Sequence, residues 1–365
     1  MRLREQKMSG GWSVDLYHDG RSISRLWIAD RQMRIGSSTI KIGGIAGVGT
    51  DAQYRKQGLA SRVLHAAIEL MQREAYDASF LYGIADFYHR FGFVTCMPQH
   101  SLELDTRRAE RAEKRLRLRP ARKADYPTIA RIYNRDSAER TASCQRDVRR
   151  WYGFPMGSGF GVPCTTRVVI DTAKKVVGYV AYDDVETHCR IAEVGGQGAD
   201  VFHALLHDMA RRAVALRRSH FSLSLPPDHP FALFCRSYGC TAHTAYERNA
   251  GPMARLINLS SCMENVRQEL ARRWGETDRQ RSLTLQTDLG HSTLSWRDDQ
   301  LCVETTRTRS TARLGQTALT QLLLGYATPN QLRTSGDLTC SATQLALLER
   351  LFPLQQAHMS WPDRF

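Results

Sequence analysis

The chain has no apolar run long enough to cross a membrane, which takes about 18 consecutive apolar residues, so we expect no membrane partner. Its start, Met-Arg-Leu-Arg-Glu-Gln-Lys-Met, lacks the apolar segment of a secretory signal peptide. Its nine cysteines include no Cys-x-x-Cys pair, which disfavours both a disulfide framework and a zinc site. Together these absences predict a cytoplasmic protein with reduced thiols and no bound metal.

Negative charge is also scarce: 37 Asp and Glu stand against 51 Lys and Arg, which gives a net charge of +14. A basic chain of this kind can bind nucleic acid. No helix-turn-helix, zinc-finger or aromatic RNA-binding motif accompanies the arginine-rich runs. We therefore interpret them as solvated helix faces and do not expect a nucleic-acid partner. The runs span residues 107–122, 146–150 and 211–218.

A basic, glycine-containing loop between a strand and a helix is the most informative motif that is present. It reads Arg55-x-x-Gly58-x-Ala60, and a helix-like apolar repeat follows at once. The unpaired N–H groups and partial positive charge of a helix N-terminus, with Arg55 and Lys56 beside them, suit a pyrophosphate. Gly58 allows the backbone to approach such a ligand, and Ala60 keeps the next position small. An ordinary strand–turn–helix corner with surface cations has the same pattern, so a second signal is needed.

The second signal follows one amphipathic helix later and reads Tyr88-His89-Arg90-Phe91-Gly92-Phe93. In this order the two motifs resemble the R/Q-x-x-G-x-G/A coenzyme loop and the Y-x-x-x-G-[FY] element of the GNAT N-acetyltransferases. Strand-like runs precede them, with a tight-turn signal at residues 18–20. We therefore predict an α+β domain with an antiparallel meander and a split beside the coenzyme strand. The upstream runs are Trp12–Tyr17, Ser22–Ala29 and Ile40–Val48.

The middle of the chain repeats the predicted element order of the first domain. At the loop position it has Gly195-Gly196-Gln197-Gly198-Ala199, with no arginine at the diagnostic site. The second element keeps only its glycine, Gly239. We predict a second GNAT-like domain that is degenerate and structural; the alternative is that its glycine run still binds a phosphate. The predicted domains are residues 1–115, 116–252 and 253–365.

The third segment has a different pattern of strands and helices. The predicted strands are residues 283–287, 292–297, 301–306 and 338–340, and the predicted helices are residues 315–324 and 342–351. Its markers are the sequence from Ala318 to Gly325, then Leu351-Phe352-Pro353, and an aromatic residue at the chain end. These resemble the sterol-carrier-protein-like domain that closes the Eis-like (enhanced intracellular survival) acetyltransferases. The resemblance implies an α+β fold with tandem GNAT-like domains, the second degenerate, followed by a sterol-carrier-protein-like domain.

The same resemblance implies the chemistry of acetyl transfer from acetyl-CoA to an amine without a metal. Tyr88 would be the general acid that protonates the leaving thiolate, and the α-carboxylate of Phe365 would be the base. The strand end would bind the pantetheine and polarise the thioester, and the loop would bind the pyrophosphate. The strand-end residues are Val48, Gly49 and Thr50; the loop residues are Arg55, Lys56, Gly58, Leu59 and Ala60.

Two further carboxylates, Asp86 and Asp363, would attract a cationic amine. The alternative for Asp86 is that it only caps the short helix Phe87–Phe91, and a terminal carboxylate such as that of Phe365 is ordinarily floppy and solvated. Family members usually have an extra strand and two helices before the first strand identified here. We therefore expect a more open acceptor pocket, or one covered by a neighbouring subunit. The family forms symmetric oligomers, commonly hexamers, so a homo-oligomer is expected.

The interpretation that best unites these signals is an N-acetyltransferase that modifies amines of an aminoglycoside-type antibiotic, kanamycin-like or kasugamycin-like, and confers resistance. A protein or peptide lysine is an alternative acceptor. A lipid- or nucleic-acid-binding protein is the alternative without catalysis. The combination of Arg55, Gly58 and Tyr88 favours the enzyme, because a pure binding protein has no need of it.

Overall fold

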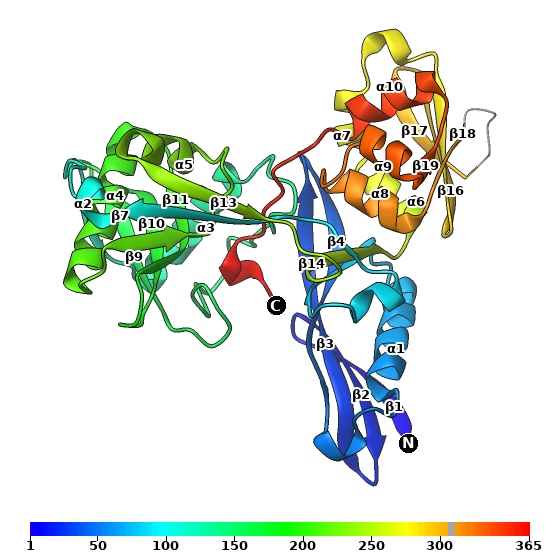
Figure 1. The fold of residues 1–365 in the computed structure, drawn as a ribbon, viewed down its shortest axis with the longest axis horizontal. Helices are drawn as coiled ribbons and strands as arrows, with labels where there is room; N and C mark the ends of the chain where they lie inside the picture. Colours follow the sequence, from blue (N-terminus) through cyan, green and yellow to red (C-terminus); the bar gives the residue numbers. More distant parts are fainter. Residues whose placement is uncertain (306–310) are drawn as a thin grey trace. The chain divides into compact units, whose positions relative to one another are not determined.

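The computed structural model describes residues 1–305 and 311–365, which form two compact units (Figure 1). The first unit consists of residues 1–97, 247–357 and 365, and the second of residues 98–246 and 358–364. Each unit is thus assembled from segments that are far apart in the sequence, and the units cross the predicted boundaries at residues 115 and 252.

A seven-stranded sheet with an antiparallel meander at one side forms the first part of unit one. The meander turns at Asp19 and Gly20, whose φ angles of 47° and 77° suit the tight turn that the sequence indicates. Helix α1 (Leu59–Arg73) covers the sheet with its apolar face, as Figure 1 shows. Along the sheet the strands are β1 (Arg2–Met8), β2 (Gly11–His18), β3 (Arg21–Ile35), β4 (Ser38–Thr50), β5 (Ala78–Gly83), β14 (Gly251–Leu256) and β6 (Val94–Thr95).

Strand β1 precedes the predicted first strand at Trp12 and was missed by the sequence analysis. It pairs with β2 over its whole length, from Arg2↔Tyr17 to Met8↔Gly11. Only Leu3 and Glu5 are partly buried, and its other residues are exposed. An edge strand with polar residues on both faces has no apolar alternation, so the pattern that reveals half-buried strands is absent from it.

Two strands pair outside the predicted domain to which their residues belong. Strand β14, near the predicted end of the second domain, pairs with β5 in the first sheet, from Gly251↔Gly83 to Leu256↔Ala78. Strand β7 (Gln99–Asp105), within the predicted first domain, lies between β12 and β13 in the second sheet. Each sheet therefore contains one strand whose residues lie outside the predicted domain that supplies its other strands.

The second unit is a seven-stranded sheet with helices α3 (Tyr126–Asp136) and α4 (Ala199–Ala215). Its element order resembles that of the first sheet, with α3 added between the first two strands. Its strands in spatial order are β13 (Cys240–Ala245), β7, β12 (His220–Leu223), β11 (Arg190–Gly196), β10 (Val176–Asp183), β9 (Cys164–Ile170) and β8 (Arg117–Pro120). The shorter helices are α2 (Thr106–Ala109), α5 (Pro230–Cys235), η3 (Lys123–Asp125), η4 (Arg236–Tyr238) and η6 (Trp361–Asp363).

A five-stranded sheet with helices follows β14 within unit one. The predicted helix at 342–351 is α10 (Ala342–Leu351). Four elements were not predicted from the sequence: α6 (Leu259–Asn265), α7 (Arg267–Arg273), α9 (Pro329–Ser335) and β18 (Thr311–Leu314). The predicted strand 301–306 is β17 (Gln300–Glu304), and its predicted last residue lies outside the described residues. The other elements are β16 (Gly290–Arg297), β15 (Ser282–Thr287), β19 (Leu338–Thr339), η5 (Glu276–Asp278) and α8 (Gln316–Leu323).

Candidate active site

Strands β4 and β5 run in parallel and then part. Their ladder consists of Ile42↔Ala78, Gly43↔Ser79 and Gly44↔Phe80, while β4 continues to Thr50 and β5 to Gly83. Beyond Gly44 the backbone of β4 is paired with β3 on one side and is outside the β5 ladder on the other. This fork therefore offers an edge of main-chain groups to an extended ligand, as the predicted split requires.

A β-bulge lies in β4 within the fork. The register passes from Trp27↔Ala46 to Arg25↔Gly49, so two residues of β4, Gly47 and Val48, oppose one residue of β3. Gly47 has a φ of 58°, which favours glycine over other residues. A bulge changes the direction in which the neighbouring peptide groups point. The sequence analysis named residues 48–50 but missed Gly47, although a glycine inside a strand pattern is a signal for a bulge.

The basic loop has the geometry of an anion site. Lys56 and Gly58 both have positive φ, 62° and 75°, and no atom lies within 4 Å of the place where a Cβ on Gly58 would be. The first helical hydrogen bond of α1 runs from the amide of Arg62 to the carbonyl of Gly58. The amides before Arg62 are therefore outside the helical ladder, and the first turn contains no acidic residue. Arg55 and Lys56 are exposed beside them, so the loop suits the pyrophosphate of a coenzyme.

Tyr88 begins the short helix η2 (Tyr88–Phe91), which ends at Gly92 with a φ of 76°. The side chain is 9 % exposed, and its ring packs edge-on against Phe87 at 4.9 Å and Phe93 at 6.2 Å between centroids. No group in residues 1–305 or 311–365 hydrogen-bonds its hydroxyl. Burial raises the pKa of the phenol above its ordinary value of 10. The phenol is therefore protonated at neutral pH, as a proton donor must be.

The last residue of the chain, Phe365, lies where β4 and β5 part. Its ring is 6.2 Å from that of Phe80 between centroids, in an edge-on arrangement. A Cβ on Gly44 would come within 2.6 Å of the same ring, so the ring occupies the space that glycine leaves open. Gly44 and Phe80 are the last pair of the ladder. The packing of its ring thus holds the last residue of the chain at the fork.

The structure gives the two predicted cation-binding carboxylates different surroundings. Asp86 is exposed, has a φ of 55° and accepts a hydrogen bond from the side chain of Asn249 at 3.0 Å. It does not cap η2, whose N-cap is Phe87 and has no side-chain capping bond. Asp363 belongs to the second unit, is 8 % exposed and binds Arg146 through both oxygens, at 2.9 and 3.0 Å. Its carboxylate is therefore already engaged by a buried arginine, which argues against a role in attracting a substrate cation.

The second sheet has a fork of the same kind, between β11 and β12. Their parallel ladder consists of Arg190↔Ser222 and Ile191↔Leu223. The end of β11 is bonded within the chain, because the carboxylate of Asp136 accepts from the amide of Gly196 at 2.7 Å and from the side chain of Gln197 at 2.9 Å. The segment before α4 also lacks the arginine of the first loop, in agreement with a degenerate site.

No helix in residues 1–305 and 311–365 combines the length and apolar character that a bilayer crossing demands. The same residues contain no group of three or more His, Cys, Asp or Glu side chains that could hold a metal ion.

The sequence matches two family descriptions. Residues 2–96 match "Acetyltransferase (GNAT) domain", and residues 271–360 match "Sterol carrier protein domain". The chain therefore contains a GNAT acetyltransferase domain, which is an enzyme domain that uses acetyl-CoA, followed by a second GNAT-like fold and a sterol carrier protein domain. No curated protein matches the sequence.

Solved structures with the same fold span nearly the whole chain. A GCN5-related N-acetyltransferase from Anabaena variabilis has a TM-score of 0.79 and 18% identity, covering 97% of this chain and 89% of its own. A probable N-acyltransferase from Enterococcus faecalis has a TM-score of 0.78 and 16% identity, covering 98% and 90%. Eis1 from Mycobacterium abscessus has a TM-score of 0.66 and 16% identity, covering 97% and 91%. At these identities the likeness establishes the fold, and the fold class is the one that the sequence predicts.

Proposed function

We propose that the chain is an acetyl-CoA-dependent N-acetyltransferase whose acceptor is a cationic amine of an aminoglycoside-type antibiotic. The observation that carries the proposal is the position of Phe365 at the fork of β4 and β5. A chain terminus is normally solvated and mobile. Here an aromatic side chain packs it against Gly44 and Phe80, beside the strand edge that would bind the thioester end of the coenzyme.

The residues of the first sheet can divide the reaction among them. The loop from Arg55 to Ala60 would hold the pyrophosphate, and the bulge at Gly47 would present main-chain N–H groups to the thioester carbonyl, where charge develops. The α-carboxylate of Phe365 would remove a proton from the attacking amine. Tyr88 would deliver a proton to the sulfur as the carbon–sulfur bond breaks. The products are the acetylated amine and the free thiol, so protons and bonds balance.

A chain terminus in the catalytic centre favours a small, multiply cationic acceptor. A carboxylate attracts a protonated amine as well as deprotonating it, and Asp86 adds a second exposed negative charge in the same unit. The Eis1 structure from Mycobacterium abscessus shares the whole arrangement of folds. We also propose that the protein forms a symmetric homo-oligomer, which light scattering would test; a strict monomer at micromolar concentration would contradict it.

The decisive experiment is a thiol-release assay with acetyl-CoA across a panel of aminoglycosides and a lysine-containing peptide. We expect release with one or more aminoglycosides and little with the peptide. The Tyr88→Phe variant is the matched control, because it removes one hydroxyl and should lose turnover with the same acceptor. Release with the peptide alone would identify a protein lysine acetyltransferase. No release with any amine would reject the enzymatic proposal.

A further inference from the structure

The segment that precedes the terminal residue is buried in the second unit. Residues 358–364 belong to that unit, and Met359, Ser360 and Asp363 are 0 %, 5 % and 8 % exposed. The amide of His358 donates to the carbonyl of Thr141 at 3.0 Å. A C-terminal segment that is only a solvated end would not be buried to this degree. The second unit therefore binds these residues specifically.

Arg146 is the centre of that binding. Its guanidinium donates to both oxygens of Glu193, at 2.7 and 2.6 Å, and to both oxygens of Asp363, at 2.9 and 3.0 Å. It is 4 % exposed and lies 3.6 Å from the ring centroid of Tyr133. Bidentate pairs of this geometry are the strong form of charged hydrogen bond, and burial protects them from screening. One arginine thus connects the core of the unit to the C-terminal segment.

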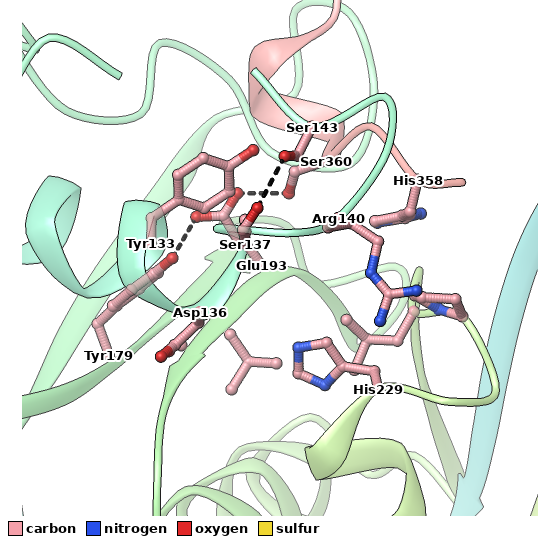
Figure 2. Close-up of a pocket in the computed structure, with 14 residues that line it drawn as sticks. Tyr133, Asp136, Ser137, Arg140, Ser143, Tyr179, Glu193, His229, His358 and Ser360 are labelled. Atoms are coloured by element: carbon pink, nitrogen blue, oxygen red, sulfur yellow. Dashed lines mark hydrogen bonds between the residues drawn. The ribbon is translucent and has the colours of Figure 1, made fainter. Parts of the chain in front are cut away.

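Glu193 is the second centre of the hydrogen-bond network around Arg146. It accepts from the hydroxyl of Tyr179 at 2.6 Å and from the hydroxyl of Ser360, as Figure 2 shows. Ser360 belongs to the C-terminal segment, so Glu193 contacts the segment directly as well as through Arg146. Its carboxylate therefore has partners on both oxygens although it is only 5 % exposed.

The network lies at the fork of the second sheet. Glu193, Val194 and Gly195 belong to β11, beyond its ladder with β12, and they line a small pocket together with His358 and Ser360 of the C-terminal segment. In the first sheet the corresponding fork is the proposed coenzyme site. In the second sheet the chain's own C-terminal segment lies against the fork, and Asp136 accepts from the amide of Gly196 at the end of β11.

We propose that the second domain anchors the C-terminal segment at its coenzyme-type fork instead of binding a coenzyme. Arg146 and Glu193 are then positioning residues: they hold Asp363 and Ser360, and so fix the segment whose last residue is Phe365. The catalytic consequence rests on the proposed function, in which the α-carboxylate of Phe365 is the base. The anchoring itself does not depend on that function.

Asp363→Asn is the most informative variant, because it removes the charge of the segment and leaves no buried charge without a partner. Arg146 keeps Glu193 as its partner, so a balanced ion pair remains in the core while the segment loses its charged contact. Removing Arg146 would instead leave two buried carboxylates without a cation, which threatens the fold. The matched control is Asp125→Asn. Asp125 is also 8 % exposed and also binds one arginine, Arg119, through both oxygens, at 2.6 and 2.8 Å.

The test is native digestion of the full-length protein with carboxypeptidase A, followed by mass spectrometry. This protease removes a terminal phenylalanine and stops at arginine, so loss of one residue reports release of the segment. Cleavage tracks the population of the released form. We expect Asp363→Asn to lose Phe365 at least about tenfold faster than the wild type or Asp125→Asn, since a charged hydrogen bond is worth that factor or more. Equal rates in all three proteins would overturn the anchoring proposal.

Ser360→Ala is the second variant, in case Asp363→Asn fails to fold by circular dichroism. It removes one hydroxyl and no charge, and we expect a smaller acceleration of cleavage in the same direction. Thiol release measured on the same samples separates the two proposals. Faster cleavage with a lower kcat and an unchanged KM for acetyl-CoA supports both. Faster cleavage with thiol release that persists after Phe365 has been removed supports the anchor and contradicts Phe365 as the base.

Discussion

The ring of Phe365 occupies the space where the side chain of Gly44 would be. A Cβ at residue 44 would come within 2.6 Å of three atoms of that ring. Gly44 is at the last rung of the β4–β5 ladder, so its missing side chain makes room for the chain terminus at the place where the strands part. The glycine is thus explained by what it accommodates, since its φ is not positive.

We expect Gly44→Ala to lower kcat by roughly tenfold to a hundredfold, because the new methyl group must displace the Phe365 ring and its carboxylate by about 1 Å. Steady-state kinetics with saturating acetyl-CoA would measure this. Gly315→Ala is the control: it lies in the same unit, and its Cβ would have no neighbour closer than 3.4 Å. Unchanged kcat in Gly44→Ala would show that the position of the ring is irrelevant to turnover.

The coenzyme loop can be tested with an isosteric pair of substitutions at Gly58. Asn tolerates the positive φ of this position, and Asp differs from it mainly by a negative charge. We expect Gly58→Asp to bind acetyl-CoA at least about tenfold more weakly than Gly58→Asn at low salt, with the difference shrinking at high salt. Calorimetry would measure both, and the wild type should bind one coenzyme per chain. Equal affinities of the two variants, or two sites per chain, would contradict the assigned loop.

Tyr88→Phe should leave coenzyme affinity intact and lower kcat roughly 10²–10⁴-fold, the usual contribution of a positioned acid. A general acid works in its protonated form, and burial raises the pKa of this phenol above 10. The wild-type rate should therefore show no loss from Tyr88 ionisation below about pH 10. A pH–rate profile of both proteins would check this. A descending limb near neutral pH that disappears in Tyr88→Phe would refute the assignment.

A C-terminal extension should abolish most of the activity, because it converts the α-carboxylate of Phe365 into an amide. Deleting Phe365 should do the same, since the new terminus lies about 3.5 Å farther back and the contact with Gly44 and Phe80 is lost. Steady-state rates of a C-terminally tagged enzyme, beside an N-terminally tagged one, would decide the matter. Equal turnover would exclude the terminal carboxylate from the mechanism.

The surroundings of Glu269 indicate that acid lowers the folding stability of unit one. Burial by itself would raise the pKa of this carboxyl, but hydrogen bonds from Arg272 and Ser37, with the charge of Arg273, outweigh burial and lower the pKa to about 2. The stabilisation is therefore complete above the ordinary value of 4.5 and is lost as the pH falls from 4.5 towards 2. At pH 7 it corresponds to about 3 kcal/mol.

Urea unfolding across this pH range would measure that stabilisation. Glu269→Gln should be less stable than the wild type by about 3 kcal/mol at pH 7 and by much less near pH 2. Glu264→Gln, whose side chain is 51% exposed beside Arg267, should change stability by less than about 0.5 kcal/mol. A difference in the free energy of unfolding between Glu269→Gln and the wild type that stays constant from pH 7 to pH 3 would contradict the link between this stabilisation and the ionisation of Glu269.

Local patterns in the sequence were enough to predict the elements around the first fork. The amphipathic repeat of α1, the basic loop and the turn at Gly92 are each formed by residues that are close together in the sequence, and the structure has all three. The position of Gly47 in the bulge was missed, although its signal was present. Phe365 at the fork came from the family resemblance, because nothing in the last residues alone indicates a buried end.

The features that were not predictable depend on partners far away in the sequence. Arg146 and Asp363 are separated by 217 residues, and no local pattern shows that they meet. Strand pairing has the same limitation: β7 and β14 each look like a strand, but the choice between two similar sheets is made by packing against distant segments. The edge strand β1 was missed because neither of its faces is apolar.

The placement of β14 has a consequence for biosynthesis. The sheet that carries Tyr88 remains one strand short until Gly251–Leu256 has left the ribosome, and until then β5 has an unpaired edge. The main body of the second unit, residues 98–246, is contiguous and is synthesised before that strand. The usual vectorial order, in which the N-terminal domain folds first, is therefore reversed here. Residues 1–97, which are translated first, must wait for a strand that is encoded far downstream, and until then the edge of β5 is open to pairing with other nascent chains.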